Sequence, residues 1–360
     1  MPHERSAAFA PGRVNLIGEH TDYNEGLALP FAIAEGVSVH AEREADAGGR
    51  AARVQALAED IGESDEFALA APAPAEGWRA FVHGAVAELA RAGFPLVGAR
   101  LRIAGEIERG SGLSSSAALE VALCLALIEL GSAAPAGAAV DALDRIALAR
   151  LCSRVENEWV GAHTGLLDQL ASLYGAPDTA LCIDFRALSV QPVALALGDW
   201  SLVVLDSGQR HAHASSGYNE RRAECARACR LLGVRSLRDA DADAAAVAAL
   251  PQPLRARARH VLGENRRVRD TVSALAGGDL PAVGELLNAS HASLRDCFAA
   301  STPAVEAAVR RLLDAGAAGA RMVGGGFGGN VLGLFAPGAG PPQGTREVRP
   351  SAGAHLLDAT

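Results

Sequence analysis

The chain has 360 residues, of which 49% are hydrophobic and 21% charged, and its formal net charge is −9 at pH 7. These values predict a soluble globular protein with room for two domains, and the negative charge argues against nucleic acids and membrane surfaces as partners. The first residues lack the basic and then apolar pattern of a secretory signal, and the longest apolar stretch, 117–130, is interrupted by two glutamates. We therefore expect a cytoplasmic protein.

All 33 basic residues are arginines. The lack of lysine excludes a Gly-Lys-Ser phosphate loop, a strand-borne kinase lysine and Schiff-base chemistry. The six cysteines are scattered, and only Cys225 and Cys229 are close enough to share a helical face. Because no second pair of metal ligands accompanies them, we expect reduced structural thiols rather than a zinc site.

The predicted elements mix strands and helices in the first half of the chain and are mainly helical in the second. A short buried strand over residues 14–17, ending at Gly18, comes first. Further strands are predicted at 31–42, 101–104, 181–185, 202–206 and 331–335. Helices are predicted at 78–92, 117–130, 140–159, 219–232, 240–276, 280–287 and 305–315. No long sequence period repeats, which excludes solenoid architectures.

Residues 12–26, here called the polar segment, gather polar groups of different chemistry around a turn at Gly18. These groups belong to Arg13, Glu19, His20 and Asp22. On a loop at the end of a strand, two carboxylates, an imidazole and a guanidinium can clamp neighbouring hydroxyls of a polyol. The alternative is a polar turn in which Thr21 or Asp22 caps a helix.

Residues 110–116, the glycine-serine loop, run directly into an apolar helix. Glycines at 110 and 112 allow close approach, and free backbone N–H groups at the positive end of a helix favour a phosphate anion. Without a lysine, the loop implies a divalent metal, to which Ser116 could offer its hydroxyl beside a carboxylate. The alternative is ordinary helix capping by Ser114 or Ser115.

Residues 324–329, the glycine turn, read Gly-Gly-Gly-Phe-Gly-Gly and formally satisfy the dinucleotide fingerprint Gly-x-Gly-x-x-Gly. That fingerprint should follow a strand and open a helix, whereas this turn leads into a predicted strand. No acidic residue follows at the distance needed to bind a ribose. A tight turn that approaches another loop or a ligand is therefore expected.

Asp168 lies among leucines, shortly after a helix that carries Glu156. Residues 161–165, a short loop with a glycine at each end, separate the two. Leucine neighbours partly desolvate a carboxylate and a nearby arginine favours its ionised form, a balance that suits a base accepting a hydroxyl proton. The alternative for Asp168 is a helix cap or a surface charge.

Two other motifs are less specific. His211 and His213 resemble a metal-binding pair, but no third ligand follows at useful spacing, so packing or solvent exposure is favoured. Tyr218 opens a helix, where it could belong to the core or reach a ligand.

The three glycine-bearing segments, in this order, resemble those of the GHMP small-molecule kinases and, within them, the galactokinases. Gly12-Arg-Val-Asn-Leu-Ile-Gly-Glu-His-Thr-Asp-Tyr-Asn is similar to the galactokinase signature, Gly-Ser-Gly-Leu-Ser-Ser-Ser-Ala to the phosphate motif and Gly-Gly-Gly-Phe-Gly-Gly to the third motif. Leu-Asp-Gln, Ser-Ser-Gly-Tyr-Asn-Glu-Arg-Arg and Ser-His-Ala-Ser-Leu-Arg-Asp add further matches, so the resemblance covers essentially the whole chain. Two departures are Leu166-Leu167, where Ile-Met is usual, and Asn330, where a small residue is common.

The resemblance implies an α+β fold of two GHMP kinase domains with the active site in the cleft between them. The first domain, 1–185, would carry the polar segment and the glycine-serine loop, and the second, 186–360, the glycine turn. The implied reaction is MgATP-dependent phosphorylation of the anomeric hydroxyl of α-D-galactose to α-D-galactose 1-phosphate in galactose catabolism. The implied cofactor is Mg²⁺, the substrates are galactose and ATP, and the protein is expected to be monomeric.

The matching positions also imply roles for individual residues. Asp168 would be the catalytic base and Arg13 the charge stabiliser beside it. The implied sugar contacts are Glu19, His20, Thr21, Asp22, Gly165, Asp168 and Tyr218. The implied ATP contacts are Gly110, Ser111, Gly112, Leu113, Ser114, Ser115 and Ser116, with Trp78 beside adenine. Ser116 and Glu156 would bind magnesium.

Two alternatives stay open. One is a related sugar-1-kinase acting on arabinose, N-acetylgalactosamine or galacturonate, although Glu19 and Asp22 would repel a carboxylated sugar. The other is a sugar-binding sensor without catalysis, against which the intact Asp168, Ser116 and Glu156 argue.

Overall fold

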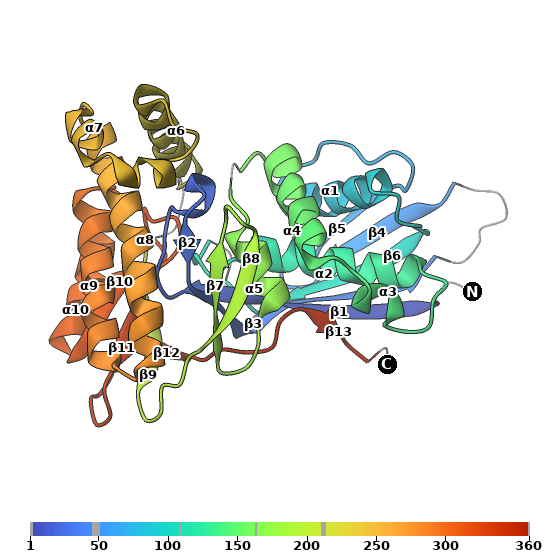
Figure 1. The fold of residues 1–360 in the computed structure, drawn as a ribbon. Coiled ribbons are helices and arrows are strands. Elements are labelled where there is room, and N and C mark those ends of the chain that lie inside the picture. The colour runs from blue at the N-terminus through green and yellow to red at the C-terminus, as the bar shows by residue number, and fades with distance from the viewer. Residues whose placement is uncertain (1–2, 45–50, 109, 163, 210–213, 359–360) are drawn as a thin grey trace.

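The computed structural model describes residues 3–44, 51–108, 110–162, 164–209 and 214–358, and within these ranges the strands form three sheets (Figure 1). The largest sheet has the strand order β13-β1-β3-β6-β4-β5 and is antiparallel except between β4 and β6. Its strands are β1 (Arg5–Asn15), β3 (Pro30–Arg43), β4 (Arg53–Ala58), β5 (Glu63–Ala68), β6 (Ala99–Gly105) and β13 (His355–Leu356). The short β13, late in the sequence, thus pairs with the first strand.

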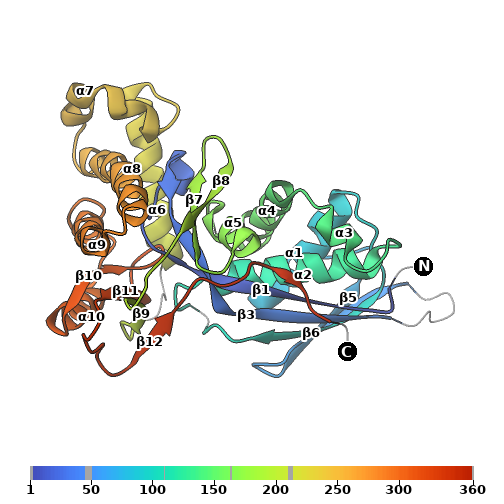
Figure 2. The same ribbon diagram turned by 60° about the horizontal axis from the view of Figure 1, so that its bottom comes forward.

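Helices cover one face of this sheet (Figure 2). They are α1 (Trp78–Arg91), α2 (Ser115–Gly131), α3 (Ala138–Asp141), α4 (Arg145–Arg154) and α5 (Leu167–Tyr174). The central helix α2 is apolar on all sides and almost wholly buried, because it packs against β1 and β3 on one side and against α1, α4 and α5 on the other. A large apolar core joins the sheet to these helices.

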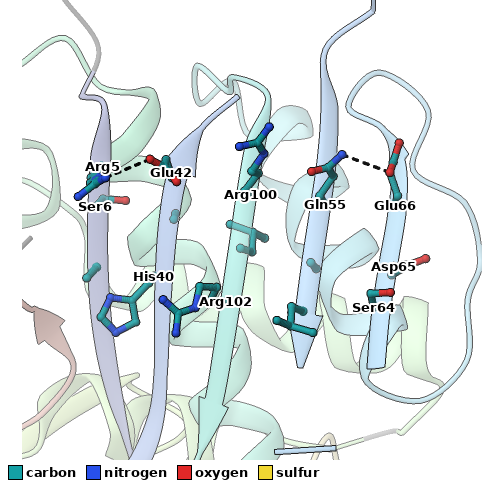
Figure 3. Close-up of a pocket in the computed structure, with 15 residues that line it drawn as sticks. Arg5, Ser6, His40, Glu42, Gln55, Ser64, Asp65, Glu66, Arg100 and Arg102 are labelled. Atoms are coloured by element: carbon teal, nitrogen blue, oxygen red, sulfur yellow. Dashed lines mark hydrogen bonds and ion pairs between the residues drawn. The ribbon is translucent and has the colours of Figure 1, made fainter. Parts of the chain in front are cut away.

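The opposite face of the six-stranded sheet is open and polar (Figure 3). It forms a shallow concavity of about 850 Å³. Arg5 pairs with Glu42 at 3.3 Å, and Arg102 pairs with Glu59 at 2.6 Å. Exposed or half-buried side chains alternate with buried ones along β6 and residues 37–43 of β3, the pattern of an antiparallel sheet with one solvated face.

Two smaller sheets complete the strand inventory. One has the order β10-β11-β9-β12 and is antiparallel, with strands β9 (Ser201–Asp206), β10 (Ala317–Met322), β11 (Asn330–Phe335) and β12 (Thr345–Val348). The other joins β2 (Leu27–Ala28), β7 (Thr179–Asp184) and β8 (Ser189–Ala194). The remaining helices are α6 (Ala214–Leu232), α7 (Ala244–Ala249), α8 (Leu254–Ala276), α9 (Leu280–Asp296) and α10 (Pro303–Asp314). Of these, α9 and α10 pack on β10 around a second apolar core.

Some element boundaries differ from the sequence expectations. The first strand begins at Arg5 and ends at Asn15, so residues 16 and 17 are buried beyond its end. The helix predicted at 140–159 is split into α3, α4 and a π-helical turn, Val155–Val160, because Asp144 caps α4 by accepting hydrogen bonds from Ile146 and Ala147.

The segment 240–276 is likewise divided into α7 and α8, at a stretch that contains Pro251 and Pro253. Helix α6 begins at Ala214, before the predicted start, and α9 continues to Asp296. The hairpin of β4 and β5 was not predicted. Within the described residues, no helix has the length and apolar character needed to cross a membrane.

Candidate active site

A cavity of about 350 Å³ brings the sequence motifs together. The polar segment contributes Arg13, Glu19, His20 and Asp22, and the glycine-serine loop contributes Gly110, Gly112, Ser114, Ser115 and Ser116. The rest of the lining includes Glu156, Thr164, Gly165, Asp168, Tyr218 and residues 324–326 of the glycine turn. The cavity therefore lies where the end of β1, the start of α2, the start of α5, α6 and the β10–β11 turn meet.

Asp168 and Arg13 form a close pair in this cavity. Arg13 donates to Asp168 Oδ1 from Nε at 2.8 Å and lies 2.7 Å from it through Nη2, while its Nη1 donates to the Gly112 carbonyl at 2.6 Å. The Ser114 hydroxyl donates to the other carboxylate oxygen, Oδ2. Both oxygens of Asp168 are thus oriented by neighbours, and one neighbour is in the glycine-serine loop.

Glu19 is buried and tied to the glycine turn. Its Oε1 accepts the Gly324 N–H at 2.7 Å and lies 3.4 Å from Nη2 of Arg321, a fully buried arginine of β10. Burial raises the pKa of Glu19, although the charges of Arg321 and Arg13 oppose that shift. The polar segment and the β10–β11 turn are therefore joined directly.

His20 is held within an aromatic cluster. Its Nδ1 lies 2.8 Å from the Tyr23 hydroxyl and its Nε2 lies 3.1 Å from the Gly325 carbonyl, while its ring lies 5.2 Å from that of Tyr218. Burial lowers the pKa of His20 to about 3, so the ring is neutral near pH 7. Burial also raises the pKa of Tyr218 well above its usual value, so its hydroxyl stays protonated. The cluster can offer neutral hydrogen-bonding groups to a ligand.

Asp22 and Gly165 are in direct contact. A Cβ at position 165 would overlap the Asp22 carboxylate, so this position requires glycine. Burial raises the pKa of Asp22 to about 6, with further raising by the charges of Asp168 and Glu19. Asp22 is thus placed at the cavity with a carboxylate that titrates near neutrality.

The glycine-serine loop leads into α2 with the geometry of an anion site. Ser114 has a left-handed backbone with φ of 63° and makes no side-chain cap, so ordinary capping does not explain it. The first N–H groups of α2 therefore lie beside the cavity. Asn330 of β11 donates to the Ser111 carbonyl through its side chain at 2.7 Å and its backbone at 3.1 Å, which anchors the loop to the second half of the chain.

Glu156 and Ser116 provide a donor set suited to Mg²⁺. The Ser116 hydroxyl donates to Glu156 Oε1 at 3.0 Å, and the other oxygen, Oε2, accepts from Thr164 at 2.6 Å and from Gln169 at 3.1 Å. Burial raises the pKa of Glu156, an effect that a bound cation would oppose. A carboxylate and a hydroxyl beside a phosphate loop are hard oxygen ligands of the kind that Mg²⁺ takes together with substrate phosphates. The residues present therefore fit the metal.

Trp78 lies in an adjoining cavity of about 270 Å³, which shares Ser115 and Ser116 with the first. Its indole N–H donates to Glu63 at 3.0 Å, and Arg79 lies over its ring at 5.1 Å. Phe81, Ile103 and Ile107 supply apolar walls. The two cavities lie on either side of the start of α2.

Besides Trp78, three predicted site residues lie outside the main cavity lining. Thr21 is buried and donates to the carbonyls of Gly18 at 2.9 Å and Leu27 at 2.8 Å, so its hydroxyl holds the turn. Ser111 and Leu113 face a different cavity on the far side of the glycine-serine loop. His211 and His213 lie outside the described residues.

Sequence reasoning also missed several buried partners of the site. Arg321 binds the polar segment, and Gln169 links Glu156 to Glu120, whose Oε2 lies 3.1 Å from the same amide nitrogen. Asn330 departs from the family pattern, but the sequence gives no sign of its contact with Ser111. Gln169 directly follows Asp168, but only the structure shows which carboxylates its amide reaches.

The sequence and fold match known kinases. Residues 2–43 match the galactokinase galactose-binding signature, 80–176 the N-terminal domain of GHMP kinases and 271–354 the C-terminal domain of GHMP kinases. The chain is 47% identical over 330 residues to a galactokinase of Mycobacterium tuberculosis, covering 90% of this chain and 87% of that protein. It is 42% identical over 341 residues to a galactokinase of Roseiflexus sp., covering 92% and 84% of the two chains.

A solved structure of Lactococcus lactis galactokinase complexed with galactose has a TM-score of 0.87 and 31% identity, covering 98% of this chain and 95% of that chain. A mevalonate kinase, at 16% identity and a TM-score of 0.66, shares the fold. The α+β GHMP kinase fold expected from the motifs is thereby confirmed. The chain belongs to the galactokinase family of the GHMP kinases and is a sugar kinase.

Proposed function

We propose that the protein phosphorylates the anomeric hydroxyl of α-D-galactose with MgATP, giving α-D-galactose 1-phosphate and ADP. The observation that carries this proposal is the position of Asp168, which is held by Arg13 and Ser114 between the polar segment and the glycine-serine loop. A base at this junction can reach a sugar hydroxyl on one side and a phosphoryl group on the other. We choose galactose as the sugar because the relatives are galactokinases and the structural neighbour was solved with galactose.

In this mechanism Asp168 accepts the proton of the anomeric hydroxyl at Oδ2, where Ser114 now donates. The anomeric oxygen forms a bond to the γ-phosphorus, and the bond from that phosphorus to the β–γ bridging oxygen breaks, so ADP leaves. Arg13 pairs with the Asp168 carboxylate and would stabilise charge that develops on the phosphoryl oxygens. Glu19, His20, Asp22 and Tyr218 would hold the sugar hydroxyls, which orients the attacking oxygen.

The same geometry supports our proposal for the nucleotide side. Backbone N–H groups of the glycine-serine loop and the start of α2 would hold the phosphates, and Trp78 would lie beside adenine in the adjoining cavity. Ser116 and Glu156 would hold Mg²⁺. When bound, this ion neutralises phosphate charge.

The direct test is ADP release, measured by a coupled assay over galactose, glucose, arabinose, galacturonate and N-acetylgalactosamine. We expect galactose to give the highest kcat/KM, and Asp168→Asn, as a negative control, to lose most activity with every sugar. Higher kcat/KM with arabinose or N-acetylgalactosamine would assign the protein to a different sugar-1-kinase activity. Sugar binding without ADP release would instead support a sensor.

A further inference from the structure

The backbone of the polar segment has a conformation that needs outside support. His20 has a left-handed backbone with φ of 61°, which is unfavourable for a residue with a side chain. Gly18 has φ of 102°, and a Cβ there would lie 2.6 Å from the Cα of Ala28. Because Glu19, His20 and Asp22 line the cavity, whatever fixes this backbone also fixes the directions of their side chains.

Helix α8, from the second half of the chain, supplies that support (Figure 1). Glu264 Oε1 accepts the Gly18 N–H at 3.1 Å, and His260 Nε2 lies 3.1 Å from the Glu19 carbonyl oxygen. Asn265 Oδ1 accepts the Leu27 N–H at 2.8 Å. The three α8 residues lie within one and a half helical turns and are all buried.

These α8 side chains are themselves fixed from behind. Ser290 of α9 donates to Glu264 Oε1 at 2.6 Å, and Arg267 donates to Oε2 at 2.7 Å. Burial would raise the pKa of Glu264, but the charges of Arg267 and Arg321 and the hydrogen bond from Ser290 help to lower it to about 2, so it is ionised near pH 7.

His260 is fixed in the same way. Burial lowers its pKa to about 4, so the ring is neutral and needs one donor and one acceptor. The Ser293 hydroxyl, 2.8 Å from Nδ1, can donate to that nitrogen, which leaves the Nε2–H to donate to Glu19.

The close approach of α8 is built into the loop as well. A Cβ at Gly26 would lie 2.5 Å from Asn265 Oδ1, so the loop and this helix are in close contact there. In contrast, Ser116 and Glu156 bond to each other within the first half of the chain. The contacts with α8 therefore support the polar segment, on the proposed sugar side of the cavity. Ser116 and Glu156, on the proposed nucleotide side, are held by other elements.

We propose that Glu264 and His260 are positioning residues for sugar recognition, which set the orientation of Glu19, His20 and Asp22 through the backbone at Gly18 and Glu19. The proposal rests on the proposed function, because it takes these three residues to be the sugar contacts. It predicts that disturbing α8 weakens sugar binding and sugar discrimination while nucleotide binding is retained.

The test is the separate measurement of the KM values for galactose and ATP, together with kcat/KM for galactose and glucose. For Glu264→Leu, which removes the acceptor at similar size, we expect the galactose KM to rise about 10-fold, the loss of one well-formed hydrogen bond. The ATP KM should stay within about 2-fold, and the ratio of kcat/KM between galactose and glucose should fall. Arg259→Gln, at an exposed position on the same helix, is the matched control and should change neither KM.

A second pair of variants decides the matter if Glu264→Leu does not fold. His260→Gln keeps an N–H that can reach the Glu19 carbonyl, whereas His260→Leu removes it. We expect His260→Leu to raise the galactose KM about 10-fold and His260→Gln to restore most of the loss. The proposal is overturned if His260→Leu and His260→Gln have the same galactose KM, or if folded Glu264→Leu keeps the wild-type galactose KM. It is also overturned if the KM values for galactose and ATP rise together in these variants.

Failure of the proposed function would be seen separately. If the wild-type protein turns over another sugar in preference to galactose, the galactose assignment is wrong, and the same comparison of KM values with that sugar tests the role of α8. If it binds a sugar without turnover, calorimetric sugar and nucleotide affinities replace the two KM values.

Discussion

The titration of Asp22 gives a quantitative test of the sugar side of the site. Burial and the nearby charges of Asp168 and Glu19 raise its pKa to about 6, while a backbone hydrogen bond from Tyr23 and the charge of Arg222 act in the opposite direction. If the ionised carboxylate accepts hydrogen bonds from galactose, protonation removes that acceptor. We therefore expect kcat/KM for galactose to fall as the pH decreases through about 6.

The magnitude follows from that value. At about pH 5, one unit below the pKa of Asp22, roughly one molecule in eleven has the ionised carboxylate, so kcat/KM should be about 10-fold below its plateau. Asp22→Asn keeps the size of the side chain but cannot titrate. It should abolish this acid limb and lower the plateau by about 5- to 150-fold, the equivalent of about 1–3 kcal/mol for an impaired buried polar contact.

The assay is the initial rate at low galactose and saturating ATP, from about pH 5 to pH 8, for the wild type and Asp22→Asn. Saturating galactose provides a control, because bound sugar should favour the ionised carboxylate and shift the limb to lower pH. A wild-type acid limb near pH 6 that persists unchanged in Asp22→Asn would show that another group titrates. An ATP KM that rises while the galactose KM stays constant would place the polar segment on the nucleotide side.

Three other predictions concern the base, the metal and stability. Asp168→Asn should lower kcat by about 10²-fold or more, with ATP affinity by calorimetry close to wild type; retention of most of kcat would exclude the base role. Glu156→Gln should need a much higher Mg²⁺ concentration for half-maximal activity and for Mg²⁺-dependent ADP binding, and an unchanged titration would move the ligand elsewhere. Burial lowers the pKa of His260 to about 4 from a usual 6.5, so the unfolded chain binds a proton that the folded protein does not; the fold is fully stable above about pH 6.5 and loses stability as the pH falls toward 4. We therefore expect the free energy of unfolding, measured with denaturant at about pH 7.5 and pH 5, to decrease by about 2 kcal/mol less in His260→Gln than in the wild type. Equal decreases in the two proteins would contradict the lowered pKa.

The loops of the site were the part most accessible from the sequence. Glycine and serine at 110–116 and the polar run at 12–26 have strong local preferences, and the structure places both at one cavity. The pairing of Arg13 with Asp168, distant in sequence, was implied only by the family resemblance. Helix α2 was also predictable, since a mainly apolar run of that length, interrupted only by Glu120 and Glu129, fits a buried helix.

The support behind the site could not be predicted in this way. Glu264 and His260 stand in a helix among arginines, a pattern typical of a solvent-exposed face, and their partners lie near Gly18. Arg321 is similar, because a lone arginine in a short strand gives no sign that it will be fully buried against Glu19. The β4–β5 hairpin was missed because its apolar alternation is weak: β5 buries only Phe67, and the apolar Leu57 of β4 is exposed. In each case the deciding contacts are tertiary.

The pairing of β13 with β1 has a consequence for how the chain folds as it is synthesised. Ala8 and Phe9 are opposite Leu356 and His355, so one edge of β1 has no strand partner until the ribosome has made residues 355 and 356. During synthesis, the first half of the chain therefore exposes this edge of β1, which can pair with strands of other chains. Fragments that end before residue 355 should accordingly aggregate more readily on release than the full chain, even though they contain the rest of the six-stranded sheet.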